Sequence, residues 1–266
     1  MKRTIAHLSD LHFGRVDPAI VEPIVQAVER LRPDVVAISG DLTQRARRVE
    51  FEQAKRFLDR LPQPRIVVPG NHDVPLRNPY SRFVSGWSLY REYISKDLEP
   101  SYRDEAIAVA GVNTARALTW KGGRINRAQI ERVRLSFCEA PASVLRIVVA
   151  HHPLDLPEAW RRQDRALRAR RAFREWAGCG VDVILAGHIH LAFAGAEAEL
   201  LRIGNHGAIV VQAGTATSTR GRGEPNSFNA LEVREKGISV ARHTWDASAK
   251  AFRVSHTHDF ARSLTR

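Results

Sequence analysis

Short runs of apolar, β-branched residues alternate along the chain with longer segments whose apolar residues recur every three or four positions. The short runs predict strands at residues 4–8, 35–39, 65–68, 106–111, 146–150, 181–186, 208–213, 230–233 and 238–242. The longer segments predict helices at residues 23–31, 50–61, 81–94, 127–137 and 165–177. This alternation predicts an α/β protein.

Local signals place some of the helix ends. Pro23 suits the first turn of a helix, and the helix at 50–61 stops before Pro62. Asn126, followed three residues later by Gln129, resembles a capping box.

The first half reads strand, helix, strand, helix, strand, which predicts parallel pairing with right-handed crossovers. The last third is richer in strands, as expected for a second sheet, and no linker or repeat divides residues 1–266, so we expect a single domain.

Polar residues follow five of the predicted strands, at the points where those strands end. They are Asp10 and His12, Asp41, Asn71, His151, and His188 with His190. In open α/β sheets, ligands bind outside the carboxyl ends of the strands. We therefore expect these side chains to converge on one crevice.

The residue types at these strand ends suit a metal site. Aspartate and the asparagine carbonyl are hard oxygen donors, and neutral imidazole suits zinc, iron and manganese. Two aspartates with two divalent cations would leave a charge of about +2, which attracts a phosphate group. Each fragment alone is a weak signal, but five in order, each at the end of a strand, predict a metal site.

The net charge favours anionic partners. The formal charge is +12, and only six of the 41 basic residues are lysine. Phosphate esters, nucleic acid and an anionic membrane surface are all compatible with such a charge. The densest arginine cluster falls in the segment 161–174, which is either a solvated helix face or a surface that meets an acidic partner.

The two cysteines and the amino-terminal segment suggest little further chemistry. Cys138 and Cys179 are too few for a disulfide framework or a thiolate zinc site, and we expect both to be ordinary side chains. The apolar stretch at residues 4–8 is too short for a signal peptide, and no run approaches the roughly 20 residues of a membrane span. The expected location is the cytoplasm.

Taken in order, the strand-end residues form Asp-x-His, Gly-Asp, Gly-Asn-His-Asp, His-His-Pro and Gly-His-x-His between Asp10 and His190. This series resembles the calcineurin-like metallophosphoesterase superfamily. The resemblance implies a four-layer α/β/β/α sandwich with two mixed sheets facing each other.

The resemblance also implies a role for each residue of the series. Asp10, His12 and His190 would hold one metal ion, Asn71, His151 and His188 the other, and Asp41 would bridge them. His72 would lie beside the scissile phosphate as acid or charge stabiliser, and Asp73 would orient it. Two divalent ions are implied, with manganese the first choice and iron or zinc the alternatives. The expected reaction is in-line attack on phosphorus by a hydroxide that bridges the metals.

Within the superfamily, the chain most resembles bacterial class III cyclic-nucleotide phosphodiesterases. The short Asp-x-His block, the Gly-Asn-His-Asp block and a Gly-, Thr- and Arg-rich segment at residues 214–229 carry this resemblance. A small phosphodiester, such as a 3′,5′-cyclic nucleotide, is the implied substrate. Arg116, His152 and Arg220 are the candidate substrate contacts.

Three alternatives stay open at this point. One is hydrolysis of a UDP-linked lipid pyrophosphate at a membrane surface, as in lipid A synthesis, which the basic segment 161–174 favours. Another is a metal-dependent nuclease, although no aromatic stacking platform is visible in the sequence. The third is a scaffold without metals, which the complete set of candidate ligands argues against. A homodimer is compatible with all of them.

Overall fold

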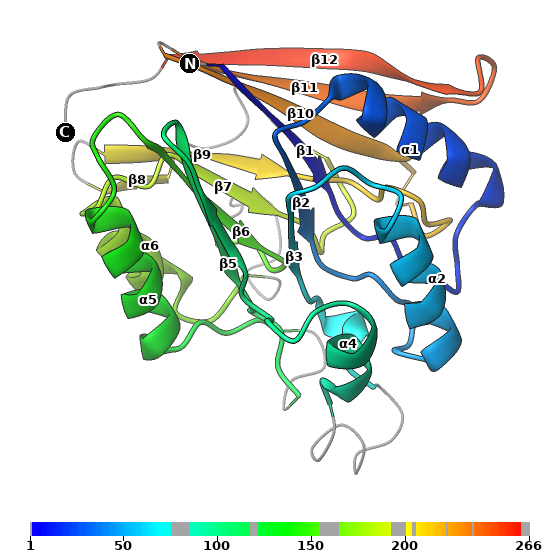
Figure 1. The fold of residues 1–266 in the computed structure, drawn as a ribbon, viewed down its shortest axis with the longest axis horizontal. Helices are drawn as coiled ribbons and strands as arrows, with labels where there is room; N and C mark the ends of the chain where they lie inside the picture. Colours follow the sequence, from blue (N-terminus) through cyan, green and yellow to red (C-terminus); the bar gives the residue numbers. More distant parts are fainter. Residues whose placement is uncertain are drawn as a thin grey trace.

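The computed structural model describes residues 2–75, 86–117, 122–154, 165–192, 201–203, 206–221, 223–235 and 237–261. Within these residues, two six-stranded sheets face each other (Figure 1). The first sheet has the order β12-β11-β10-β1-β2-β3, and the second has the order β4-β5-β6-β7-β9-β8. Helices α1 and α2 cover the first sheet, and α5 and α6 cover the second (Figure 1). The expectation of a four-layer sandwich is confirmed.

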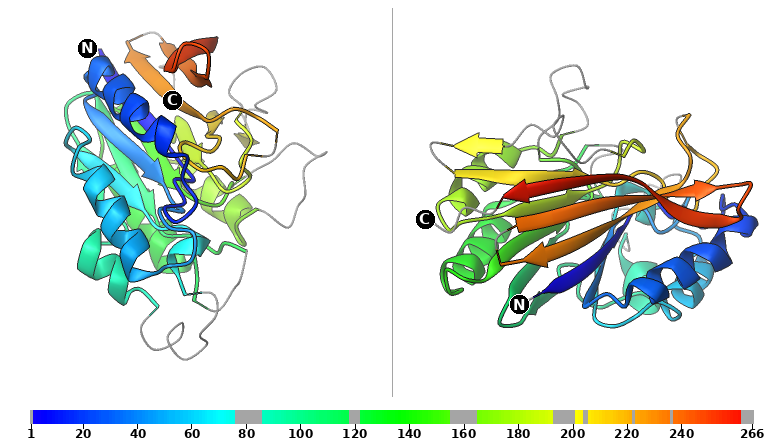
Figure 2. Two further views of the ribbon diagram at one scale, coloured as in Figure 1. Left: turned by 90° about the vertical axis from the view of Figure 1, so that its right-hand side faces the viewer. Right: turned by 90° about the horizontal axis from the view of Figure 1, so that it is seen from above.

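The first sheet combines a parallel half and an antiparallel half. Its strands are β1 (Arg3–Leu8), β2 (Val35–Ser39), β3 (Arg65–Val68), β10 (Ser227–Arg234), β11 (Gly237–Asp246) and β12 (Ala251–Ala261). Strands β1, β2 and β3 pair in parallel, connected through α1 (Pro18–Leu31) and α2 (Arg48–Leu58). Strands β10, β11 and β12 add an antiparallel meander beside β1, visible from above in Figure 2.

The second sheet is parallel at its centre. Its strands are β4 (Ser101–Arg103), β5 (Ile107–Val112), β6 (Leu145–Ala150), β7 (Val183–Ala186), β8 (Leu201–Ile203) and β9 (His206–Gln212). Strands β5, β6, β7 and β9 run parallel, whereas β4 and β8 are antiparallel edges. The remaining helices are α4 (Ser88–Tyr93), α5 (Arg127–Cys138), α6 (Ala169–Ala177) and a 3₁₀ turn, η1 (Asn71–Asp73).

Three apolar layers hold the sandwich together. In β6, Ile147 and Val149 pack between the two sheets, whereas Val148 and Ala150 pack under α5 and α6. Because side chains alternate across a strand and both faces are covered, the whole of β6 is buried. This double burial explains why the predicted strands read as continuous apolar runs.

Several predicted boundaries were wrong. Helix α1 begins at Pro18 rather than Pro23, because Asp17 caps it by accepting a hydrogen bond from Ala19 N at 3.0 Å. Helix α6 begins at Ala169 rather than residue 165, since Arg168 has a left-handed backbone with φ of 67°. The capping box of α5 is confirmed: Asn126 N donates to Gln129 Oε1, and Gln129 N donates to Asn126 Oδ1.

Two arginines of the basic segment, Arg161 and Arg162, lie outside the described residues, as do residues 81–85 of a predicted helix. In the described part, Arg165 and Arg168 precede α6 instead of lying on it.

No helix among the described residues combines the length and the apolar character that crossing a bilayer requires.

The expectation for the cysteines was also wrong. Cys138, at the end of α5, and Cys179, just after α6, form a disulfide with Cα atoms 4.7 Å apart. The prediction rested on the number of cysteines, whereas the bond depends on two helix ends that meet only in the folded sandwich. The disulfide links the two helices that cover the second sheet.

Candidate metal centre

The candidate ligands lie at the carboxyl ends of five strands, three in the first sheet and two in the second. Asp10 and His12 follow β1, Asp41 follows β2, and Asn71 begins the 3₁₀ turn after β3. His151 follows β6, and His188 and His190 follow β7. The first sheet thus supplies the carboxylates and the amide, and the second sheet supplies three of the four imidazoles.

The backbone at these positions is unusual. Asp10, His12, Asp41, His188 and His190 all have positive φ, between 51° and 77°. A left-handed backbone costs a non-glycine residue about 1–2 kcal/mol. Hydrogen bonds hold these turns in place, among them His12 N to Asp41 O at 2.9 Å and His188 N to Asp10 Oδ2 at 3.0 Å. Strain retained at five candidate ligands indicates a functional site.

One group of ligand atoms forms around His12. Its Nε2 lies 3.3 Å from His190 Nε2, 3.6 Å from Asp10 Oδ1 and 3.7 Å from Asp41 Oδ2. All four side chains are buried. These separations suit donors that share one cation, and we call this group the first cluster.

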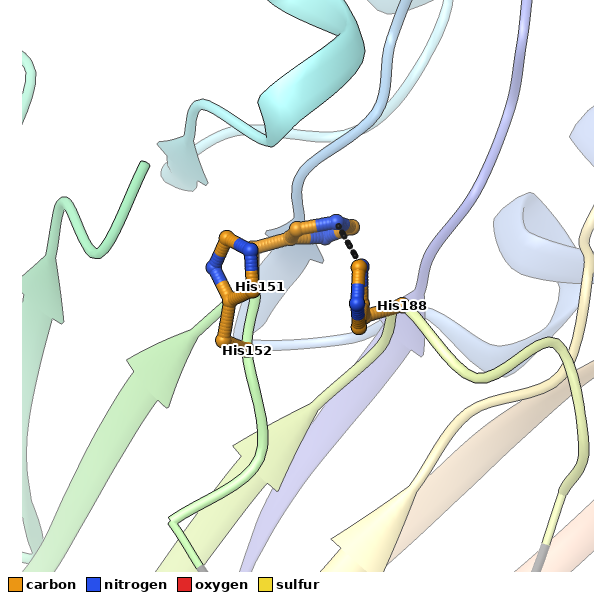
Figure 3. A group of neighbouring side chains, drawn as sticks. All are labelled: His151, His152 and His188. Carbon is orange, nitrogen blue, oxygen red and sulfur yellow. Dashed lines mark hydrogen bonds between the residues drawn. The ribbon is translucent and has the colours of Figure 1, made fainter. Parts of the chain in front are cut away.

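A second group forms around His151. Its Nε2 lies 3.1 Å from Asn71 Oδ1, 3.3 Å from His188 Nδ1 and 3.4 Å from Asp41 Oδ1. Figure 3 shows His151, His152 and His188 together at the ends of β6 and β7, with a dashed line between His151 and His188. In this second cluster, Asp41 takes part through Oδ1, whereas it faces the first cluster through Oδ2.

Main-chain carbonyls orient two of the imidazoles. His151 Nδ1 lies 2.7 Å from Ser39 O, and His190 Nδ1 lies 3.2 Å from Arg220 O. Because a carbonyl can only accept, both Nδ1 atoms carry a proton, and each Nε2 is directed at its cluster. Such a contact is the usual way in which a metal-binding histidine is held.

His152 differs from its neighbour His151. Thr114 Oγ1 accepts a hydrogen bond from His152 N at 3.1 Å and lies 2.8 Å from His152 Nδ1. The ring of His152 lies 4.5 Å, centroid to centroid, from that of His188. His152 is therefore at the site, and its position keeps it a candidate substrate contact.

The buried charges depend on one another. Burial alone would raise the pKa of the Asp41 carboxyl, but His151 and His72 outweigh it and hold the pKa well below its usual value. Burial would lower the pKa of His151, but the carboxylates of Asp41 and Asp10 and the Ser39 carbonyl raise it to about 9. The carboxylates are thus held ionised, and the site favours positive charge.

The side chains fit divalent cations. Buried carboxylates normally accept several hydrogen bonds, yet Asp10 Oδ1 is buried without a hydrogen-bond donor. It lies 3.3 Å from His190 Nε2 and 3.6 Å from His12 Nε2. Two groups of oxygen and nitrogen donors that share Asp41 are what a pair of divalent ions requires.

Two glycines of the motifs allow this close packing. A Cβ atom on Gly70 would overlap the carboxylate of Asp41, and one on Gly187 would overlap Ser9 Oγ and approach Asp10 Oδ2. The glycines are therefore needed for the approach of neighbouring backbone to the candidate ligands.

His72 lies at the site, but Asp73 does not orient it. His72 Nδ1 lies 2.8 Å from Gln44 O, and its Nε2 lies 3.2 Å from Arg220 Nη1. The Asp73 carboxylate instead accepts hydrogen bonds from the backbone amides of residues 42, 43 and 70. The expected role of Asp73 is corrected: it holds the turns that carry Asp41 and Asn71.

The two candidate arginines have different surroundings. Arg220 is beside His72, and its carbonyl also contacts His190. Arg116 donates to the carbonyl of Arg124 at 3.3 Å and to Gln129 Oε1 at 3.1 Å. The contacts of Arg220 agree with a place at the substrate, and those of Arg116 place it at the start of α5.

A two-sheet sandwich with two histidine and carboxylate clusters at its strand ends is the architecture of a metal-dependent phosphoester hydrolase. The chain belongs to the calcineurin-like phosphoesterase family, whose sequence profile matches residues 3–192. It is 36% identical over 80 residues to the glycerophosphodiester phosphodiesterase GpdQ of Enterobacter lignolyticus, an alignment covering 26% of this chain and 29% of GpdQ. It is 32% identical over 87 residues to a protein of Synechococcus named probable cyclic nucleotide phosphodiesterase, covering 29% of this chain and 34% of that protein.

Solved structures agree on the fold. The purple acid phosphatase PPD1 from seeds of yellow lupin superposes with a TM-score of 0.72, covering 98% of this chain and 54% of the other at 14% identity. Identity this low supports the fold alone. The alignments with the two curated relatives span about a third of the length of those proteins.

Proposed function

We propose that the protein is a phosphodiesterase that hydrolyses small phosphodiesters at a centre of two divalent metal ions. The proposed ligands are Asp10, His12, Asp41, Asn71, His151, His188 and His190. Asp41 carries the proposal, because its Oδ1 lies 3.4 Å from His151 Nε2 and its Oδ2 lies 3.7 Å from His12 Nε2. One carboxylate facing two donor groups is what a bridge between two cations needs.

The metals and the chain have separate tasks. Two divalent cations bound at the clusters would polarise the phosphoryl oxygens and acidify a water molecule. Arg220, through its guanidinium, offers further positive charge beside His72. His72 donates its Nδ1 proton to Gln44 O, so Nε2 is the nitrogen that would contact the substrate.

His72 protonates the leaving oxygen only if Nε2 carries a second proton. Burial of the ring lowers the pKa of His72, and the carboxylate of Asp41 opposes this effect. The lowered pKa makes the protonated form of His72 less populated near neutral pH than that of a free histidine, so general acid catalysis would use this smaller protonated fraction. His72 and Arg220 together provide a proton donor and a charge for the departing group.

Two observations favour a diester over a monoester. A diester carries one negative charge fewer than a monoester dianion, so it needs less positive charge beyond the metals. Arg220 is the one guanidinium that the described residues place in hydrogen-bonding distance of His72. The relatives from Enterobacter lignolyticus and Synechococcus are also named phosphodiesterases.

Manganese is the proposed metal, with iron or zinc as alternatives, because the donor set mixes carboxylate, amide and imidazole groups. With Mn²⁺, bis-p-nitrophenyl phosphate should be hydrolysed with a higher kcat/KM than p-nitrophenyl phosphate. At least one 3′,5′-cyclic nucleotide should be opened to a monophosphate that accumulates. Asp41→Ala, prepared in the same way, controls for contaminating phosphatases.

Better hydrolysis of the monoester, with no cyclic nucleotide opened, would exclude the phosphodiesterase proposal and leave only the metal site. Arg220→Ala should raise KM for the cyclic nucleotide while affecting the small chromogenic diester little, because the chromogenic diester has no sugar to hold.

A further inference from the structure

Three arginines meet beside the second cluster, on three segments joined by backbone hydrogen bonds. Arg124 N donates to Thr114 O at 2.8 Å, and Leu167 N donates to Gly123 O at 2.7 Å. Arg116 lies two residues after Thr114, Arg124 comes directly after Gly123, and Arg168 comes directly after Leu167. Because Arg116 also donates to the carbonyl of Arg124, the backbone positions of the three arginines lie close together.

These arginines crowd one another. Burial lowers the pKa of Arg116, and the charges of Arg124 and Arg168 lower it further, while the carboxylate of Glu99 acts in the opposite direction. Glu99 also accepts from the backbone N of Asn113 and lies 3.4 Å from Arg132 Nη2. In the described part of the chain, neither Arg124 nor Arg168 forms an ion pair with a carboxylate. Positive charges gathered in this way are suited to an anion.

The arginine group is separated from the second cluster by one side chain. The ring of His152 lies against that of His188 on one side, as Figure 3 shows. His152 also packs so closely on Gly123 that a Cβ atom there would overlap the ring. Arg124 is the next residue after Gly123. The backbone that carries Arg124 therefore packs directly on His152, next to the second cluster.

We propose that Arg116, Arg124 and Arg168 form a second phosphate subsite, which makes nucleotide diesters with an additional phosphate the preferred substrates. The scissile phosphate occupies the metal clusters, and the additional phosphate is bound by the arginines on the far side of His152. Arginine suits this task because its planar guanidinium donates two parallel hydrogen bonds to phosphate. The inference rests on the proposed function and adds a substrate class to it.

A pair of chromogenic esters tests the subsite. Thymidine 5′-(p-nitrophenyl phosphate) and its 3′-phosphorylated counterpart share the same leaving group and differ by one phosphate. The Mn-loaded enzyme should hydrolyse the 3′-phosphorylated ester with a kcat/KM about tenfold higher. The ratio should shrink in high salt, because the Debye length falls from about 10 Å at 0.1 M to about 3 Å at 1 M.

Arginine variants test whether these side chains cause the difference in kcat/KM between the two esters. In Arg124→Gln/Arg168→Gln, the ratio of kcat/KM values should fall to about one. Arg170→Gln removes one positive charge from an exposed position on α6 and should keep the wild-type ratio. Thermal unfolding of each variant shows whether it is folded. A wild-type ratio near one, or a ratio unchanged in the double variant, would overturn the subsite.

Binding without metals separates the two proposals. In EDTA, calorimetric titration with thymidine 3′,5′-bisphosphate should show binding at least about fivefold weaker in the double variant than in wild type or Arg170→Gln. If neither ester is hydrolysed but this difference is found, the proposed function fails and the subsite stands. If both esters are hydrolysed equally and binding is the same in all three proteins, the function stands and the subsite fails.

Discussion

Asp41 has two carboxylate oxygens, and each faces a different cluster. Asp41→Ala should therefore lose at least about one metal equivalent and nearly all activity, because one bridging ligand holds both cations. Elemental analysis after gel filtration measures the metal content. Asn71→Ala, which changes only the second cluster, should instead be partly rescued by excess metal. Two full metal equivalents in Asp41→Ala would contradict the bridging role.

His72 contacts Gln44 O and Arg220 but lies outside the donor groups of both clusters. His72→Ala should keep its metals and lose about 10²- to 10⁴-fold in rate, the usual size of a general-acid contribution. The loss should be smaller for p-nitrophenyl esters, whose leaving group needs little protonation. A comparison of esters with good and poor leaving groups measures this; equal losses would argue against His72 as the acid.

At the scale of single residues, the sequence indicated the side chains that point into the site but not the contacts that hold them. Ser39 and Gln44 orient His151 and His72 through main-chain carbonyls, which every residue has. No residue type could reveal such contacts. The family resemblance implied that Asp73 orients His72, whereas the 3₁₀ turn directs its carboxylate at backbone amides.

Among the elements, the strands buried on both faces were the easiest to predict. Strands β2, β3 and β6 read as continuous apolar runs and were found almost to the residue. The edge strands β4, β8 and β12 were missed. Strand β12 has 11 residues, but its middle is exposed on both faces, so neither an apolar run nor an alternating pattern marks it.

The helices that cover the second sheet carry a cross-link, Cys138–Cys179, across 41 residues. Closing a loop of this length restricts the unfolded chain, so Cys138→Ser/Cys179→Ser should lose about 2–4 kcal/mol of unfolding free energy. Denaturant unfolding with and without a reducing agent measures it. The reduced wild type should match the double variant, and metal content should be unchanged because the ligands lie at the strand ends. No change on reduction would contradict a stabilising bond.

Across the whole molecule, the candidate ligands come from two different sheets. Contacts such as His151 Nδ1 to Ser39 O and His188 N to Asp10 Oδ2 already join these sheets. Metals bound between them should stabilise the fold by about 4 kcal/mol per site when the free metal is 1,000 times Kd. Differential scanning calorimetry should show a lower Tm after chelation, restored by Mn²⁺ but not in Asp41→Ala. An unchanged Tm would mean that the metals do not bridge the sheets.

Protons and metals should compete at His151, whose pKa in the metal-free protein is raised to about 9. Near pH 7 a proton occupies the Nε2 that would bind metal, so metal binding releases it. Apparent affinity should rise about tenfold per pH unit up to about pH 9. Titration calorimetry in buffers of different ionisation enthalpy counts the released protons.

The same raised pKa has a consequence for the stability of the metal-free protein. Protonation of His151 contributes its full stabilisation below the unfolded-state pKa near 6.5, and this is lost as the pH rises through about 9. The stability of the metal-loaded protein should not fall in this way as the pH rises. Tm values across that range, with and without EDTA, compare the two.

The left-handed backbone at Asp10, His12, Asp41, His188 and His190 limits how this centre can be transplanted. Copying the seven side chains onto regular strands of another scaffold would reproduce the chemistry of the donors but not their directions. A designer would have to graft whole turns, with their glycines and the hydrogen bonds that hold them. The transferable unit is therefore a set of five loops, and any host must offer strand ends at matching positions in two facing sheets.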